Sequence, residues 1–146
     1  MKIRKATKKD ISEMMRIIVI NSPSYPKNIA KKEIEEMFSK SLYKPTYLVI
    51  EENKRVIAFG GFIRSWMDSM IFNLFWVNTN PKNKGIGIGT KLIEELINEI
   101  KKIKEKPKAK LIILSTKIPS FYKKFGFKIL TNKYDGDYVL MEREIK

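Results

Sequence analysis

Three alternate glycines, Gly85, Gly87 and Gly89, join an uncharged apolar stretch over Met70–Thr79 to a stretch with apolar residues at helical spacing. Glycine has no Cβ, so a ligand can approach its backbone closely, and the first N–H groups of a helix are free to bind an anion. The same glycines also suit a tight turn or close packing without a ligand. Lys84–Thr90 is therefore a candidate phosphate site.

The two commonest nucleotide-binding motifs do not fit this stretch. A Walker A loop needs glycine directly before Lys-Ser/Thr, whereas here Thr90 precedes Lys91. The dinucleotide fingerprint needs its third glycine at position 90 and an acid after the next strand. That strand, expected over Leu111–Leu114, is followed by Ser115 and Thr116. Both nucleotide-binding interpretations are therefore weakened.

The chain contains no Cys and no His. Cys nucleophiles, Ser-His-Asp triads, disulfides and zinc sites built on Cys or His are therefore excluded. A catalytic proton carrier must be a carboxylate, Tyr, Lys, a chain terminus or water. We expect no metal site.

Basic residues dominate the charge of the 146-residue chain, with 30 Lys and Arg against 16 Asp and Glu, a formal charge of +14. Such a charge attracts anions, including phosphate groups and nucleic acid. The lysines are spread along the whole chain, however, and no repeat or low-complexity linker divides it. We interpret the charge as compositional rather than as a nucleic-acid-binding surface, and we expect one domain over residues 1–146.

Two stretches resemble motifs of one known family. Asn80–Ile93 resembles the central motif of the GNAT superfamily of acyl-CoA-dependent N-acyltransferases, Arg/Gln-x-x-Gly-x-Gly/Ala, with Lys84 at the Arg/Gln position. Gly87 and Gly89 stand at its glycine positions. Ser120–Phe127 resembles the family's Phe-Tyr-x-x-x-Gly-Phe segment. Two motifs in the family's order are more specific than either motif alone.

The resemblance implies an N-acetyltransferase that uses acetyl-CoA as cosubstrate and a primary amine as acceptor. Because no Cys can form an acyl-enzyme, we expect direct attack by the amine in a ternary complex. Tyr122 corresponds to the family's proton donor to the CoA thiolate. Cosubstrate contacts are implied for pantetheine at Val77 and Thr79, for pyrophosphate at Lys84, Gly85, Ile86, Gly87, Ile88, Gly89 and Thr90, and at Ser115, where the family commonly has Asn.

The general base is not assigned by the sequence. The family often supplies a Glu from its central strands, but no acid lies between Ser69 and Thr79. Asp68 is the nearest candidate, with Glu51 and Glu52 further off. For all three we favour the simpler interpretation of a solvated charge at a strand end.

The acceptor is a small-molecule or peptide amine that the sequence does not specify. In the resembling family, a loop like the one around Tyr25 and a turn like the one with Asp135 and Asp137 border the acceptor pocket. These three residues are therefore candidate acceptor contacts. A packing Tyr and the ordinary requirements of a tight turn explain them as well.

Hydrophobic periodicity and turn residues predict an α/β (α+β) fold with the element order βααβββαβαββ. This order is similar to that of the GNAT fold, a mixed, mostly antiparallel central sheet flanked by helices. We expect strands over residues 2–6, 47–51, 55–64, 70–79, 111–114, 128–132 and 138–142, and helices ending near residue 21, over 29–42 and from 88 onward, with a last helix before the final strand pair.

Two functions of other classes stay open. One is a non-catalytic acyl-CoA-binding or regulatory module, suggested by the missing Glu, and the other is a basic nucleic-acid-binding domain. A homodimer is also left open. Because no apolar run approaches membrane-spanning length and residues 1–10 contain no signal-peptide core, we expect a cytoplasmic protein with no membrane partner.

Overall fold

The computed structural model describes residues 1–146 and has the predicted element order. Three short 3-10 turns, Lys8–Asp10, Glu36–Phe38 and Pro81–Asn83, accompany the main elements. The main elements are β1 (Lys2–Lys5), α1 (Ile11–Asn21), α2 (Lys27–Glu35), β2 (Thr46–Glu52), β3 (Arg55–Arg64), β4 (Ile71–Thr79), α3 (Ile88–Lys102), β5 (Leu111–Thr116), α4 (Pro119–Lys123), β6 (Lys128–Asp135) and β7 (Tyr138–Glu144).

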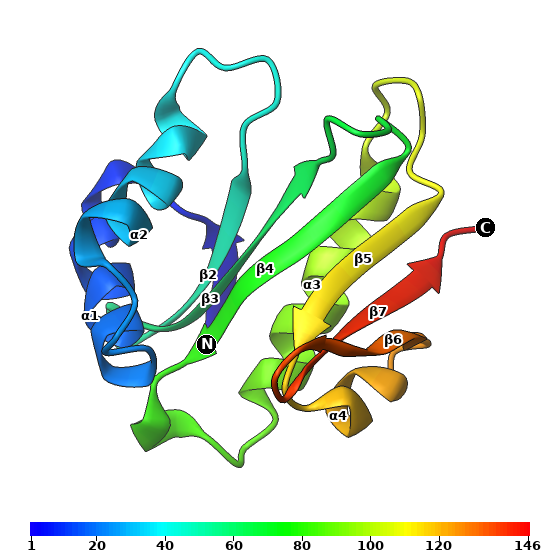
Figure 1. Ribbon diagram of the computed structural model, residues 1–146. Helices are drawn as coiled ribbons and strands as arrows, with labels where there is room; N and C mark the ends of the chain where they lie inside the picture. The colour runs from blue at the N-terminus through cyan, green and yellow to red at the C-terminus, as the bar shows by residue number, and fades with distance from the viewer.

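The seven strands form one sheet in the order β1-β2-β3-β4-β5-β7-β6. Every neighbouring pair is antiparallel except β4 and β5, which are parallel. Figure 1 shows α1 and α2 together beside the N-terminal half of the sheet, with α3 behind β4 and β5. The predicted mixed, mostly antiparallel sheet with flanking helices is confirmed.

Alternation along β2 divides the interior into two cores. Tyr47 and Val49 belong to the cluster formed with α1 and α2, whereas Leu48 and Ile50 belong to the larger cluster around α3. All four side chains are buried. A strand buried on both faces lies between two layers of helix, which explains why this stretch is almost uninterruptedly apolar.

The amphipathic pattern that predicts a helix after the glycines produces α3. Its buried face consists of Ile88, Leu92, Ile93, Leu96, Ile97 and Ile100. Burying apolar side chains of this size contributes roughly 1.5–3 kcal/mol each relative to exposure. This face anchors the helix on the sheet and so positions its N-terminal end. No helix in the chain combines the length and apolarity needed to cross a membrane.

The glycine pair in β3 allows close packing on both faces of the strand. A Cβ on Gly61 would lie 2.7 Å from the ring of Tyr47, and a Cβ on Gly60 would lie 2.9 Å from a methyl of Leu96. The pairing of β3 with β4 also shifts register between Phe59 and Gly61. The structure thus contains both features that a glycine inside a strand commonly marks, a bulge and a close approach of side chains to the backbone.

The second helix is shorter than predicted. Residues 29–42 were expected to be helical from their apolar spacing, but α2 ends at Glu35 and only a 3-10 turn continues it to Phe38. The Ser39 hydroxyl donates a hydrogen bond of 2.7 Å to the carbonyl of Glu36, and the backbone of Ser39 is extended. A serine that binds a carbonyl of the preceding turn competes with helix continuation.

The final hairpin is tighter than predicted. β6 continues to Asp135, so only Gly136 and Asp137 form the turn to β7. Gly136 has a φ of +55°, a conformation that glycine adopts without strain and that two-residue hairpin turns require.

An ion-pair cluster joins β1 to β2 and to the start of α1. The guanidinium of Arg4 donates to Asp10 at 2.7 and 2.9 Å and to Glu51 at 2.7 Å. Asp10 is buried and also accepts the N–H of Thr7 at 2.7 Å. The hydrogen bond from Arg4 is the main reason that the pKa of Asp10 lies below its usual value. Glu51 is therefore occupied in a structural ion pair.

We predict that Asp10→Asn lowers the free energy of unfolding at about pH 7 by about 2 kcal/mol, because charged hydrogen bonds of Arg4 and Thr7 are weakened. A carboxylate with a lowered pKa stabilises the fold above its unfolded pKa of about 4 and loses that effect as the pH falls. The difference between wild type and variant should therefore shrink as the pH is lowered below about 4 in urea denaturation. Glu35→Gln, at an exposed acid without an ion pair, is the control. Equal stability of wild type and Asp10→Asn at neutral pH would contradict the prediction.

Candidate active site

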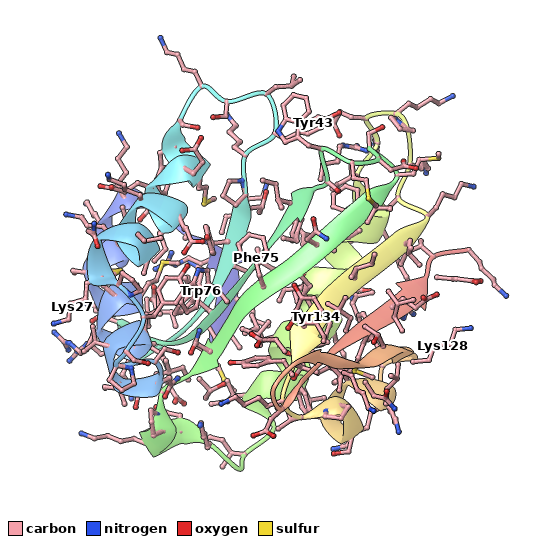
Figure 2. All side chains as sticks on the ribbon, in the orientation of Figure 1. Lys27, Tyr43, Phe75, Trp76, Lys128 and Tyr134 are labelled. Atoms are coloured by element: carbon pink, nitrogen blue, oxygen red, sulfur yellow. The ribbon has the colours of Figure 1, made fainter.

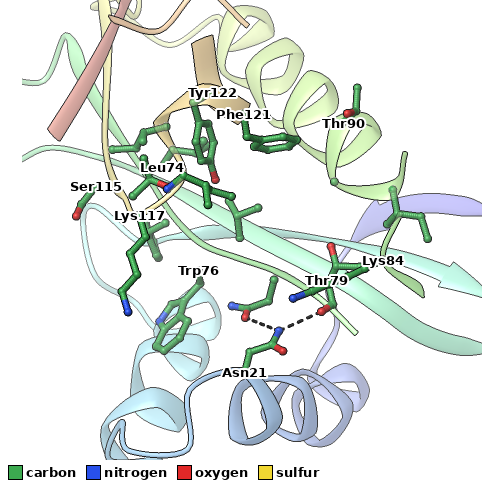
Figure 3. Close-up of a pocket in the computed structure, with 18 of the residues that line it drawn as sticks. Asn21, Leu74, Trp76, Thr79, Lys84, Thr90, Ser115, Lys117, Phe121 and Tyr122 are labelled. Atoms are coloured by element: carbon green, nitrogen blue, oxygen red, sulfur yellow. Dashed lines mark hydrogen bonds between the residues drawn. The ribbon is translucent and has the colours of Figure 1, made fainter. Parts of the chain in front are cut away.

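The site is formed where β4 and β5 separate. Their parallel pairing includes only three residue pairs and ends at Asn73 with Ile113. Beyond this point, a cavity of about 850 Å³ opens between the C-terminal parts of the two strands, α4 and the start of α3 (Figure 3). The edge of β4 that faces β5 therefore carries backbone groups without a strand partner, and buried backbone groups require a partner.

The glycine-rich stretch over residues 84–90 forms one wall of this cavity. Gly85 and Gly87 have φ values of +85° and +79°, which favour glycine, and a Cβ on Gly87 would meet no atom within 4 Å. The first bonded N–H of the helix is that of Lys91, which donates to the Gly87 carbonyl at 3.1 Å. None of the N–H groups over residues 85–90 donates to a backbone carbonyl. Free donors at a helix start beside open space form an anion-binding cradle.

Positive charge surrounds the cavity. Lys84, Lys117 and Lys124 line it, and no Asp or Glu does. Three cations with no compensating acid favour an anionic ligand over a cationic one in this part of the site.

Tyr122 reaches the cavity from α4. Its side chain is only 7% exposed and packs edge-on against Phe121 and Phe127, with ring centroids 5.0 and 5.9 Å away. Figure 3 shows its hydroxyl pointing into the cavity toward Leu74 of β4. Burial raises the pKa of Tyr122 to about 12. The phenol therefore keeps its proton at neutral pH and can donate it to a bound group.

The end of α1 is tied to the end of β4 on the opposite side of the cavity. The side-chain amide of Asn21 donates to the Asn78 side chain at 2.9 Å and to the Thr79 carbonyl at 3.0 Å, as Figure 3 shows. All three residues line the cavity. These hydrogen bonds hold the last residues of β4 in place, although those residues are not paired with β5.

An aromatic cluster with one carboxylate lies beside the cavity. Trp76, which lines the cavity, has a φ of +50°, and its ring packs edge-on against Tyr25 at 4.9 Å. One carboxylate oxygen of Glu33 accepts both the Tyr25 hydroxyl at 2.8 Å and the Trp76 indole N–H at 3.3 Å. Desolvation, then the bond to Glu33, raises the pKa of Tyr25. Tyr25 thus contacts a cavity residue rather than the cavity itself.

The structure brings the predicted contact residues together. Val77, Thr79, Lys84, Gly85, Gly87, Ile88, Gly89, Thr90, Ser115 and Tyr122 all line the one cavity. Ile86 does not line it, and its side chain is 65% exposed. Because it lies between two glycines with positive φ, its side chain is directed to solvent, and only its backbone is available to a ligand.

Several lining residues were not predicted. Asn21, Trp76 and Asn78 come from segments whose proximity follows only from the sheet order. Phe121, which precedes Tyr122 in the second motif, also lines the cavity, and its ring lies 3.4 Å from where a Cβ on Gly89 would be.

The acids considered from the sequence lie elsewhere. Asp68 caps the turn before β4 by accepting the N–H of Met70 at 2.9 Å, and Glu51 pairs with Arg4. Asp135 and Asp137 are exposed at the last hairpin. None of them lines the cavity, so no general base is assigned among them.

A parallel strand pair that separates beside a glycine-led helix, with a tyrosine facing the gap, is the arrangement that the resemblance to the GNAT motifs implies. A sequence model described as "Acetyltransferase (GNAT) domain" matches residues 44–129, more than half of the chain. The protein therefore belongs to the GNAT acetyltransferase family, as its motifs indicate. No curated protein sequence matches the chain.

Solved structures of acetyltransferases share the fold over almost their full length. An aminoglycoside 6'-acetyltransferase type Ii has 19% identity and a TM-score of 0.80, with 100% of this chain and 98% of that chain covered. The PaiA N-acetyltransferase from Thermoplasma acidophilum, solved with coenzyme A, has 19% identity and a TM-score of 0.72, with 99% and 98% covered. An aminoglycoside 6'-N-acetyltransferase complexed with coenzyme A has 17% identity and a TM-score of 0.79, with 100% and 98% covered.

We predict that Gly87→Glu weakens coenzyme A binding by about tenfold or more, because it adds a negative charge beside the free N–H groups where a phosphate would lie. Gly87→Lys is the matched control, since it adds the same backbone strain and a long side chain with the opposite charge. Titration calorimetry of both variants measures the difference. The cradle would be wrongly assigned if Gly87→Glu bound coenzyme A with wild-type affinity.

Proposed function

We propose that the protein transfers an acetyl group from acetyl-CoA to a primary amine by direct attack in a ternary complex. The observation that carries the proposal is the separation of β4 from β5 beside the free N–H groups that start α3. An extended acyl chain can pair with an open strand edge in the way that a peptide adds a strand to a sheet. The acyl donor supplies an activated thioester carbonyl.

The lining residues fit acetyl-CoA along its length. The backbone of residues 84–90 would bind the pyrophosphate, and Lys117 and Lys124 add positive charge at the cavity wall. The open edge of β4 at Val77 and Thr79 would bind the pantetheine. A backbone N–H near Val77 would polarise the thioester carbonyl and stabilise the developing oxyanion.

In the chemical step, the neutral amine nitrogen forms a C–N bond to the thioester carbon, and the C–S bond breaks. The thiolate takes the hydroxyl proton of Tyr122, the amine loses its surplus proton to water, and Tyr122 regains a proton from water. With its pKa raised to about 12, Tyr122 is a weaker acid than a free thiol, whose pKa is about 8.5. The proton transfer is therefore uphill, and it is preceded by a hydrogen bond from the hydroxyl that stabilises the thiolate as it forms.

The acceptor amine would approach from the side of Trp76. Glu33, bonded to the Trp76 indole, is an acid adjacent to the cavity on the α2 side, and it offsets the charge of Lys117, whose side chain extends toward Trp76 in Figure 3. An aromatic ring together with a carboxylate attracts a cation. Deprotonation of the amine is assigned to water, because no acid lines the cavity.

The same absence of a lining acid favours one alternative function. A catalytically inactive acyl-CoA-binding or regulatory module would keep the cradle and the open strand edge but would need no general base. The two functions differ in turnover and not in cosubstrate binding.

We predict one-to-one binding of acetyl-CoA by titration calorimetry and thiol release with members of an amine panel that includes diamines, aminoglycosides, amino acids and peptide N-termini. Because the chain contains no Cys, every thiol detected with a thiol reagent comes from coenzyme A. NAD and a short RNA are the binding controls. Binding without turnover across the panel would favour the non-catalytic module, and absence of binding by folded protein would refute both functions.

We predict that Tyr122→Phe lowers the rate of acetyl transfer by about a hundredfold with little change in acetyl-CoA affinity, because the ring and its packing are kept while the proton donor is lost. Since the pKa of Tyr122 is near 12, its removal should leave the shape of the pH–rate profile unchanged between about pH 6 and pH 9. Tyr134→Phe, at an exposed tyrosine outside the cavity, is the control. An unchanged single-turnover rate would remove Tyr122 from the chemistry.

A further inference from the structure

Three loops meet at the end of the molecule opposite the cavity. They are residues 39–45 between α2 and β2, residues 65–70 between β3 and β4, and residues 103–110 between α3 and β5, and all three lie at the top of Figure 1. We call this surface the basic apolar tip. It adjoins the N-terminal end of β4, whereas the cavity is lined by the C-terminal half of that strand.

Side-chain contacts join the three loops into one surface. The ring of Tyr43 packs against that of Trp66 with centroids 4.7 Å apart, which joins the first loop to the second. The guanidinium of Arg64 donates to the Ser69 carbonyl at 2.6 Å and to the Pro107 carbonyl at 2.6 Å, which joins the second loop to the third. These bonds hold the backbone of the tip in a defined arrangement.

Large apolar side chains project from this surface into solvent. Leu42 is 74% exposed, Trp66 is 73% exposed and Met67 is 78% exposed. In Figure 2 the Tyr43 ring, which packs against Trp66, lies at the same end of the molecule. Single exposed apolar residues are common on protein surfaces, but a Trp, a Met and a Leu on two loops in contact form a cluster that the monomer leaves uncovered.

Lysines dominate the charge of the same three loops. The three loops contain six lysines, all exposed, against only two acids, Asp68 and Glu105. The lysines are Lys40, Lys44, Lys104, Lys106, Lys108 and Lys110. Exposed Trp and aliphatic side chains on loops rich in lysine combine the two attractions of a peripheral membrane site, burial at the boundary of the acyl chains and attraction to anionic headgroups.

We propose that the basic apolar tip docks the protein on an anionic lipid surface. Trp66, Met67 and Leu42 enter the interfacial layer, and the lysines contact the anionic headgroups. This docking needs no membrane-spanning segment, so it differs from the expectation of no membrane partner that was based on the length of apolar runs. With the tip on the lipid, the cavity at the other end of β4 faces the aqueous phase and stays accessible.

Two other occupants fit the surface less well. A second copy of the chain docked through the same surface would place the lysines of the two copies against each other, and like charges across an interface repel. A nucleic acid would use aromatic faces for base stacking, but Tyr43 is already packed on Trp66, and Leu42 and Met67 have no stacking face. Charge together with aliphatic exposure favours the lipid surface.

The test is sedimentation of the full chain with vesicles of phosphatidylcholine, with and without phosphatidylglycerol. We expect wild type to bind only the anionic vesicles. We expect the double variant Leu42→Ser, Met67→Ser to bind them at least about tenfold more weakly than wild type does. Both side chains are exposed, so these changes should not affect folding. Circular dichroism and the affinity for acetyl-CoA check that the double variant is folded. Leu130→Ser, at an exposed leucine on β6, is the matched control and should bind as wild type does.

Tryptophan fluorescence gives a second readout. The emission of wild type should shift to the blue with anionic vesicles, and Trp66→Tyr should remove the shift, because Trp76 lies at the cavity instead. The proposal is overturned if wild type does not bind, or if the double variant binds as tightly as wild type, which would indicate attraction by overall charge alone. Two results would assign the tip to another partner. One is that the double variant binds a short RNA more weakly than wild type does. The other is that wild type forms a dimer but binds no vesicles, and that the double variant is monomeric.

Discussion

The early end of the hydrogen bonding between β4 and β5 is the constraint on which the rest of the site depends. Only three residue pairs connect the two parallel strands, and past Asn73 each has an edge without a strand partner. Backbone groups that have lost their partners require a ligand or water. Because α3 follows β4 and α4 follows β5, the free N–H groups and Tyr122 necessarily border this gap.

The site and the tip distribute charge in different ways. In the cavity, Lys84, Lys117 and Lys124 surround open space without an acid, an arrangement suited to the phosphates of an acyl-CoA. Glu33 does not line the cavity but accepts the indole N–H of Trp76, which does. At the tip, lysines share their loops with exposed apolar side chains instead. The formal charge of +14, which by itself suggests only composition, thus includes local arrangements with distinct uses.

Local sequence signals predicted most of the elements. Periodicity over a few residues accounts for the apolar face of α3 and for the strand β4. Turn chemistry accounts for the tight connection between β2 and β3 at Asn53, which has a φ of +51°. The end of α2 was wrong because apolar spacing continues past the position where Ser39 binds the Glu36 carbonyl. Periodicity reports which face is apolar, whereas the end of a helix is decided by hydrogen bonds of single side chains.

The sequence by itself determined the family, the element order and ten of the 24 residues that line the cavity, because the two motifs are continuous stretches whose geometry is local. Only the tertiary structure decided that Asn21 would hold Asn78, that Glu33 would bind Trp76, and that Tyr43 would pack on Trp66 from another loop. These pairs are separated by 23 to 57 positions. Their proximity depends on how the sheet orders its strands and on which faces the helices cover, a property of the whole packed chain that no short stretch contains.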